Sequence, residues 1–163
     1  MKALIIYDSF FGNTEKVART IGDGLIGRME VEVRRVSNVK PEQRAGLDLL
    51  IVGSPTRAFR SSRAVSNFLR RIPPNSLQGI KAAGFDTRIS ASDTNPRVLS
   101  FLMSLFGYAA KPISEKLRKK GAQIVIAPEG FFVSGTEGPL KEAELERAAA
   151  WAKQIIAASS TTQ

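Results

Sequence analysis

The stretch KALIIYDSFFGNTEKVA, residues 2–18, decides how the chain is built. It begins with an uninterrupted apolar run, which predicts a buried strand over residues 3–7. Apolar side chains then recur at the spacing of a helix, at Val17, Ala18, Ile21 and Leu25. Between the strand and the helix lies a turn of hydroxyl, amide and glycine residues, DSFFGNT. A strand that runs through a polar turn into a helix is the repeating unit of α/β proteins.

This alternation of strand and helix continues along the chain. Further strands are predicted at residues 29–36, 47–53, 80–86 and 122–128. A helix is predicted at residues 61–72 and another from near Pro139 onward, with Trp151 in the core. The last helix has an apolar stripe that we expect to be buried, formed by Leu145, Ala148, Ala149, Ala152, Ile155 and Ile156. Five strands that alternate with helices imply a doubly wound parallel sheet with helices on both faces.

The region between Arg88 and Lys120 is longer than one helix requires. Gly107 and Pro112 divide it into two predicted helical pieces, PRVLSFLMSLFGYAA and KPISEKLRKKG. Within the first piece, residues 98–106 are apolar on nearly every side. A helix of that kind must bury itself, so we expect it to pack near a ligand or in a subunit interface.

Length and composition exclude several classes of protein. The 163 residues suit a single domain over residues 1–158, with a frayed tail at residues 159–163. No apolar run approaches the roughly 18 residues that span a bilayer, and the first one is too short for a signal peptide, so we expect a cytoplasmic protein without membrane insertion. The absence of Cys and His excludes disulfides, thiolate or imidazole metal sites and imidazole catalysis. We therefore predict neither a metal site nor a catalytic side chain.

The charge of the chain is strongly positive and unevenly distributed. Lys and Arg number 24 against 15 acids, which gives a net charge of +9. No acid occurs between Asp48 and Asp86, an interval that contains Arg57, Arg60, Arg63, Arg70, Arg71 and Lys81. Such a basic field attracts nucleic acid, membrane surfaces or acidic proteins. The alternative is a solvated helix face that keeps the protein from aggregating.

The turn at residues 8–14 is suited to a phosphate monoester. Main-chain amides at a helix start are unpaired and the helix dipole is positive there, so an anion can bind without a charged side chain. Ser9, Asn13 and Thr14 offer further donors, and Gly12 allows the backbone a close approach. The phosphate loops GxGxxG and GxxxxGK[ST] are absent, and the third strand ends in Gly-Ser instead of the acid of a response regulator. A capped turn without a ligand is the alternative interpretation.

The segment SFFGNTEKVA resembles the phosphate loop of flavodoxins, whose pattern is [ST]-x-[ST]-G-x-T. The resemblance implies the five-stranded flavodoxin-like sheet, in the order 2-1-3-4-5, and FMN as the cofactor. GSPTRAF stands where flavodoxins contact one face of the isoalloxazine, and its PTR also resembles flavodoxin-like NAD(P)H:quinone oxidoreductases. FDTR stands at the third flavin loop, and GFFVSGTEGPL is similar to a segment of bacterial and archaeal flavodoxin-like proteins. The resemblance thus spans the whole chain.

Carried over position by position, the resemblance implies three groups of FMN-binding residues. The phosphate would lie against Ser9, Phe10, Phe11, Gly12, Asn13 and Thr14. The ring would be bordered on one side by Ser54, Pro55, Thr56, Arg57 and Phe59, and on the other by Asp86, Thr87 and Arg88. Phe11 stands where the family has a hydroxyl, so one side-chain hydrogen bond should be lost. Flavodoxins are also typically acidic, which this chain is not.

Three functions remain open at this point. The resemblance favours an electron carrier that passes electrons from FMN to a partner protein, and the basic charge favours an acidic partner. The alternative is an FMN-dependent reductase that takes hydride from NAD(P)H and reduces a quinone. A further alternative is an FMN-free binding module that uses its basic face on a protein or, less favoured, on nucleic acid. The sequence leaves the oligomeric state open.

Overall fold

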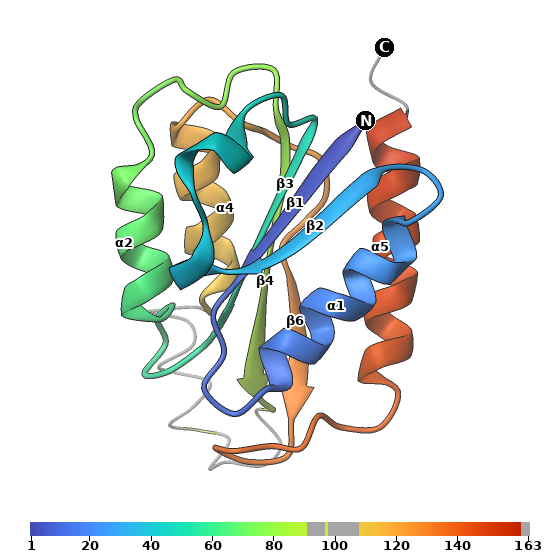
Figure 1. The fold of residues 1–163 in the computed structure, drawn as a ribbon. Helices are drawn as coiled ribbons and strands as arrows, with labels where there is room; N and C mark the ends of the chain where they lie inside the picture. The colour runs from blue at the N-terminus through green and yellow to red at the C-terminus, as the bar shows by residue number, and fades with distance from the viewer. Residues whose placement is uncertain (91–96, 98–107, 161–163) are drawn as a thin grey trace.

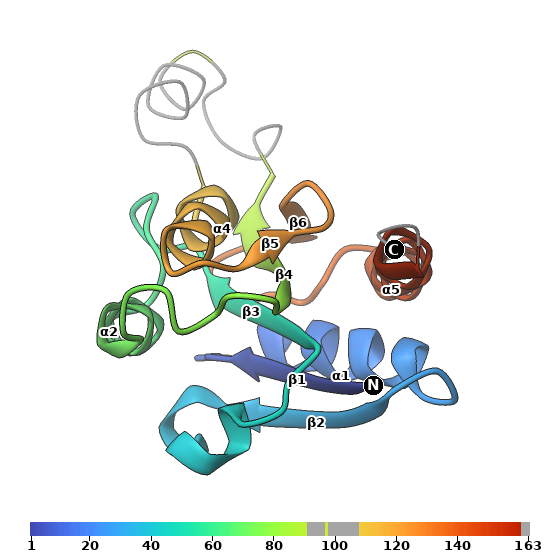
Figure 2. The ribbon, with the colours of Figure 1, turned by 90° about the horizontal axis from the view of Figure 1, so that it is seen from above.

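The computed structural model describes residues 1–90, 97 and 108–160. Within these residues, the strands form one parallel sheet and are β1 Lys2–Tyr7, β2 Glu30–Arg35, β3 Leu49–Pro55, β4 Lys81–Ile89, β5 Gln123–Ile124 and β6 Glu129–Val133. The sheet has the order β2-β1-β3-β4-β5, and β6 also pairs with β4 (Figure 1 and Figure 2). This order confirms the predicted doubly wound sheet, which begins near its middle and winds outward in both directions.

Helices cover both faces of the sheet. They are α1 Asn13–Leu25, α2 Arg63–Arg71, α4 Ala110–Lys119 and α5 Glu144–Ser160, with the short 3-10 helices η1 Val36–Asn38 and η2 Pro41–Arg44 between β2 and β3. Helices α1 and α5 pack on one face, and α2 and α4 pack on the other (Figure 2). None of the helices in the described part of the chain is long and apolar enough to cross a bilayer.

The alternation of side chains along the strands divides the core into two layers. Ile5 and Ile51 point toward α1 and α5, where they join Trp151 as the sequence predicts. Leu4 and Leu50 point the other way, toward α2 and α4. Successive strand residues face opposite sides of a sheet, so an uninterrupted apolar run fills both layers at once. This is why the central strands can be recognised as apolar runs in the sequence.

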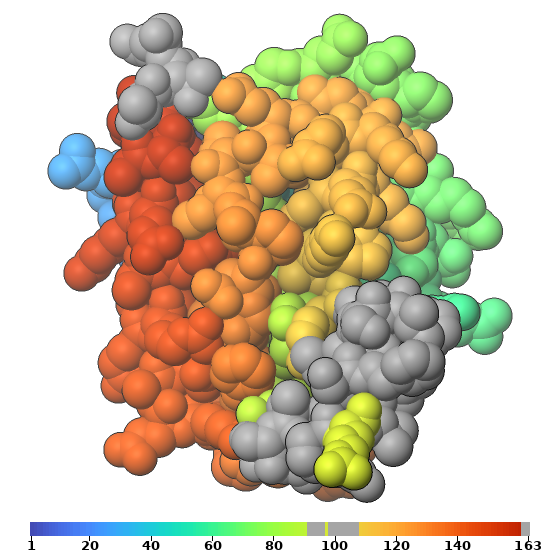
Figure 3. Space-filling model, turned by 180° about the vertical axis from the view of Figure 1, so that it is seen from behind, coloured from blue at the N-terminus to red at the C-terminus, as the bar shows by residue number. Residues whose placement is uncertain are grey.

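The outer strand beside β4 differs from the prediction of one continuous strand at residues 122–128. Two short segments lie along β4 instead, because β5 pairs Gln123 with Lys81 and β6 pairs Glu129 with Phe85. Between them the chain leaves the ladder at residues 126–128, and Pro128 has no amide hydrogen to donate to it. Figure 3 shows this segment on the surface between α4 and α5. As a result β6, and not the predicted strand, reaches the carboxyl edge of the sheet.

The last helix begins later than predicted. Pro139 does not start it but lies in a return loop, where its carbonyl accepts the amide of Ser134 at 2.9 Å. Leu140 then bridges to Val133 of β6, and the helix α5 begins at Glu144. The predicted burial of Leu145 is therefore wrong: its side chain is 38% exposed, because Leu140 packs against the core from the loop.

Two further predictions concern the region before α4 and the tail. The second predicted helical piece corresponds to α4, whereas the apolar piece at residues 98–106 lies outside the described residues. Helix α5 continues to Ser160, past the predicted domain boundary at residue 158. The buried residue Ser159 is held there, since Lys81 Nζ donates a hydrogen bond to its carbonyl.

Candidate functional site

A pocket opens at the carboxyl edge of the sheet, where β1, β3, β4 and β6 end. Its volume is about 230 Å³. It is lined by Ser9, Phe10, Phe11, Asn13, Thr14, Pro55, Thr56, Arg57, Ala58, Thr87, Arg88, Ile89, Val133 and Thr136. Parallel strands bring these four separate parts of the chain together, because their carboxyl ends share one edge. All but four of the residues predicted to bind FMN line this pocket.

The loop before α1 leaves the start of that helix open. Gly12 takes the left-handed backbone conformation, with φ 87°, and no side chain caps the helix. The Ser9 hydroxyl instead accepts the amide of Gly12 at 3.0 Å. Among the described residues, no acceptor binds the amides of the first helical turn, residues 13–15. The structure therefore has the free donors that an anion requires, and the capped-turn interpretation does not hold.

Two side chains at the start of α1 already form hydrogen bonds with other parts of the site. The Thr14 hydroxyl lies 2.7 Å from the hydroxyl of Thr87, and both residues are buried. The side-chain Nδ2 of Asn13 donates to the carbonyl of Glu137, in the loop after β6, at 2.9 Å. These contacts tie the start of α1 to the end of β4 and to the loop after β6, so the shape of the pocket depends on all three.

The middle loop turns sharply above the pocket. Arg57 and Arg60 exchange main-chain hydrogen bonds of 3.0 Å, and Ala58 and Phe59 between them have positive φ. The Arg57 guanidinium lies over the ring of Phe10, 5.1 Å from its centroid. Phe10 is itself 49% exposed. A cation and two exposed aromatic rings, those of Phe10 and Phe11, thus stand at the mouth of the pocket.

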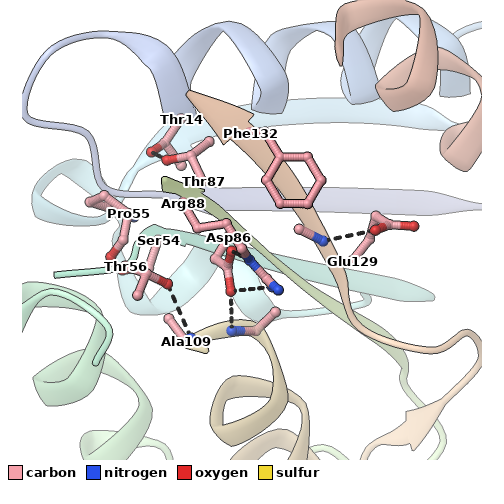
Figure 4. A network of polar contacts seen from close by, with 12 residues as sticks. Thr14, Ser54, Pro55, Thr56, Asp86, Thr87, Arg88, Ala109, Glu129 and Phe132 are labelled. Carbon is pink, nitrogen blue, oxygen red and sulfur yellow. Dashed lines mark hydrogen bonds and ion pairs between the residues drawn. The ribbon is translucent and has the colours of Figure 1, made fainter. Parts of the chain in front are cut away.

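A buried ion pair lies beneath the opposite wall. Asp86 is fully buried, and its carboxylate accepts from Arg88 Nε at 2.5 Å and from the amide of Ala110 at 2.8 Å. Figure 4 shows this network, including the bond from the Ala109 amide to the hydroxyl of Thr56. Burial raises the pKa of the Asp86 carboxyl, while the hydrogen bonds and charge of Arg88 act to lower it. The pair fastens β4 to the start of α4.

The Arg88 side chain is enclosed on two further sides. Its guanidinium lies 3.5 Å from the centroid of the Tyr108 ring. It also passes directly over Gly130 of β6, where a Cβ atom would lie 2.2 Å from the guanidinium carbon. Arg88 therefore borders the pocket as a fixed and neutralised group, whereas Arg57 is exposed and forms no ion pair with the described residues.

Four predicted residues do not line the pocket but support it. Gly12 shapes the first loop, and Asp86 anchors Arg88. Ser54 is buried, and its hydroxyl accepts the amide of Ser62 at 2.8 Å, which positions the start of α2. Phe59 is half-buried in the middle loop.

Sequence reasoning missed other lining residues, namely Ala58, Ile89, Val133 and Thr136. The segment GFFVSGTEGPL carried a usable signal for the last two. It contains most of β6 and the loop that follows, and that loop lies at the same carboxyl edge as the ends of the other strands.

Known proteins share this architecture. The family model described as flavodoxin matches residues 5–151. Flavodoxin 2 from Bacillus cereus is 24% identical, with a TM-score of 0.76 over 96% of this chain and 99% of that one. A flavodoxin from the domain Archaea is 21% identical, with a TM-score of 0.74 over 98% and 99%. The rubredoxin oxygen:oxidoreductase of Desulfovibrio gigas is 20% identical, with a TM-score of 0.65 over 98% of this chain but only 36% of that one.

The doubly wound sheet and the open helix start at its carboxyl edge define an α/β protein of the class that binds a phosphorylated ligand at that edge. The match to the family model identifies it more closely: the chain belongs to the flavodoxin family. Flavodoxins bind FMN and carry electrons, so FMN is the cofactor of this chain. The pocket fits that assignment, since the free amides of residues 13–15 can receive a phosphate.

Proposed function

We propose that this flavodoxin-like protein holds FMN in the carboxyl-edge pocket and passes its electrons to a partner protein. The observation that carries the proposal is the uncapped start of α1, with unbound amides at residues 13–15 beside a pocket formed by four loops. FMN supplies the redox chemistry when it is bound. The chain needs only to bind the phosphate, border the ring and leave one edge accessible.

The proposed roles of the pocket residues follow from their positions. The loop from Ser9 to Thr14 would bind the phosphate through main-chain amides. Pro55, Thr56 and Arg57 would border one side of the ring, and Thr87 and Arg88 the other. Phe10 and Phe11 are the exposed aromatic residues at the pocket, so they are better placed than the half-buried Phe59 to contact the ring.

The partner that we propose is an acidic protein in the cytoplasm. Arg57 and Arg60 are exposed in the loop that leads from the pocket to α2, and Arg63 is exposed at the first position of that helix. Cations around the accessible edge of a cofactor favour a partner with carboxylates in the facing positions and speed its approach at low salt.

Titration of the apoprotein with FMN and with riboflavin tests the cofactor site. We expect FMN to bind much more tightly, because riboflavin lacks the phosphate that the first loop would hold. Quenching of flavin fluorescence measures both affinities. Equal affinities for the two flavins would contradict the role of the first loop, and a failure of both to bind would contradict the proposed function.

An FMN-dependent NAD(P)H:quinone reductase is a second candidate. Arg57 favours it, because an exposed guanidinium at the mouth of the pocket can bind the phosphate of a nucleotide. Consumption of NADPH by the FMN-loaded protein, with a quinone as acceptor, distinguishes the two functions. Turnover that falls in the Arg57→Gln variant supports the reductase, and absence of turnover leaves the electron carrier.

A further inference from the structure

Helix α2 is flanked by two grooves that are separate from the flavin pocket. The first, which we call the α2–η2 groove, lies between α2 and the segment that carries η1 and η2 and has a volume of about 380 Å³. Its apolar floor includes Val36, Val39 and Phe68, which are only partly buried against the core. Its rim carries the exposed or half-exposed cations Lys40, Arg44 and Arg71.

The second, the α2–α4 groove, lies on the other side of the same helix and has a volume of about 390 Å³. It is lined by Leu69 together with Arg70, Lys116, Lys119 and Lys120. Figure 2 shows α2 between α4 and the 3-10 segment, so the two grooves run along opposite sides of one helix. The first groove combines an apolar floor with a basic rim, whereas the second is lined mainly by basic side chains and its one apolar residue, Leu69, is buried.

The charge of this surface is not neutralised from within the protein. Among the described residues, none of the rim cations of either groove takes part in an ion pair. Helix α2 contains no acid, and the acids of the neighbouring elements are Glu42 in η2 and Glu115 in α4, both exposed. The surface therefore attracts an anion through several cations at once.

We propose that α2 and its two grooves form the docking surface for an acidic, amphipathic segment of the partner protein. Apolar side chains of that segment would fill the floor of the α2–η2 groove, and its carboxylates would pair with the rim. An apolar centre surrounded by charged groups is the usual anatomy of a protein interface. Nucleic acid fits less well, because a phosphate backbone would use the cations but leave Val39 and Phe68 in contact with water.

The docking surface begins close to the flavin pocket, at the start of α2. The hydrogen bond from the Ser62 amide to Ser54 fixes the start of α2 directly after the strand that ends at the pocket. The loop between them carries Arg57 and Arg60. A partner on the first turn of α2 would thus stand near the pocket, while Arg71 would bind it at the other end of the helix. The inference rests on the proposed electron-transfer function for the kind of partner, but binding to α2 does not require FMN.

A labelled synthetic peptide tests the surface. The peptide forms a helix with glutamates on one face and leucines on the other, and its binding to the FMN-loaded protein is measured by fluorescence anisotropy. We expect binding at low salt that weakens as salt rises. The double variant Arg44→Glu and Arg71→Glu should bind at least about tenfold more weakly. The matched control, Arg28→Glu and Lys153→Glu, makes the same change in net charge at exposed positions outside the grooves and should change binding less than about twofold.

Two further measurements separate the apolar contribution from charge alone. The variants Val39→Ser and Phe68→Ser are made singly, so that one poorly folding variant does not decide the result. Each should weaken the binding of the amphipathic peptide but not the binding of a polyglutamate of equal charge. Equal losses of peptide affinity in the groove and control variants would overturn the proposal. So would a DNA duplex that binds more tightly than the peptide and whose affinity is unchanged in both serine variants. FMN affinity is measured in parallel. If the protein binds the peptide but not FMN, the electron-carrier function is contradicted and the docking surface is still supported.

Discussion

At the scale of single residues, the hydroxyl pair of Thr14 and Thr87 connects the phosphate loop to the end of β4. The two oxygens are 2.7 Å apart, and Thr14 is 1% exposed. One hydroxyl donates to the other, so the hydrogen of the accepting hydroxyl remains available for a ligand. The pair can therefore support the loop and still contribute a donor to the pocket.

Replacing Thr14 with Val should weaken FMN binding by about 1–3 kcal/mol, because a buried hydroxyl loses its partner and the loop loses its tie to Thr87. Thr87→Val should act in the same direction. The double variant should lose less than the sum of the single variants, because the two residues share one bond. Flavin fluorescence titration measures each affinity, and Thr20→Val, farther along α1, serves as the control. Unchanged affinity in Thr14→Val would remove Thr14 from the site.

The two arginines at the pocket should affect the flavin differently. Asp86 neutralises Arg88 in a bidentate pair, with distances of 2.5 and 2.7 Å, whereas Arg57 is exposed at the mouth. Arg57→Gln should make the potential of each one-electron reduction of the bound flavin more negative by roughly 10–40 mV, the equivalent of about 0.2–1 kcal/mol for an exposed charge. Reductive titration at low and high salt measures the shift. A potential unchanged at low salt would assign Arg57 no electrostatic role.

At the scale of secondary-structure elements, α1 and α5 approach each other closely at Gly24. A Cβ atom at this position would lie 2.7 Å from Cβ of Ala152. Alanine is favoured over glycine in a helix by about 1 kcal/mol, but overpacking of a fixed contact destabilises by about 1–3 kcal/mol. The contact therefore outweighs the helix propensity in this position.

Gly24→Ala should accordingly lower the free energy of unfolding by up to about 2 kcal/mol, as measured by denaturant titration. Ala152→Gly removes the atom that the new methyl group meets. The double variant should thus be more stable than the sum of the two single changes predicts. A Gly24→Ala variant that is more stable than the wild type would show that the two helices can move apart at little cost.

Glu32 connects β2 to its neighbours and should make stability depend on pH. A hydrogen bond from Gln43 of η2, followed by Arg34 and the charge of Lys2, lowers the pKa of the Glu32 carboxyl. A carboxyl with a lowered folded pKa contributes stability above its unfolded pKa, about 4.3, and loses that contribution as pH falls through the folded value. The difference in unfolding midpoint between wild type and Glu32→Gln should therefore shrink between pH 6 and pH 3. A constant difference would show that Glu32 acts by packing alone.

The elements that could be predicted are those whose signal is local. The apolar runs of β1, β3 and β4 identify them, because strands buried on both faces consist mainly of apolar residues. The shared carboxyl edge of these strands brought most of the predicted site residues into one pocket. The pairing of Asp86 with Arg88 was also available, because residues two apart in a strand point to the same face.

Other features depend on contacts that no local pattern records. Pro139 is an acceptable first residue of a helix, yet the bridge between Val133 and Leu140 holds it in a loop. The division of the outer strand depends on which residues of β4 remain to be paired, which is a property of the sheet and not of the segment itself.

At the scale of the whole molecule, the net charge of +9 should limit stability at low ionic strength. Like charges repel one another more in the compact state than in the unfolded chain, and salt screens that repulsion. We expect the free energy of unfolding to rise between low and moderate concentrations of KCl. The variant Arg70→Gln and Arg71→Gln should gain less, by at most about 1 kcal/mol for each charge removed. An equal rise in the free energy of unfolding in the wild type and the variant would show that the repulsion does not involve Arg70 and Arg71.

The interrupted strand at the outer edge of the sheet also bears on how the protein behaves at high concentration. A long exposed strand offers unpaired amides and carbonyls on which a second chain can add and begin a fibril. Here β5 spans only Gln123 and Ile124 before the chain turns away at residues 126–128 and Pro128 withholds a donor. A strand from a second chain would find no continuous row of main-chain hydrogen-bonding groups along this segment. The break that divides β5 from β6 therefore makes this edge of the sheet a poor template for polymerisation.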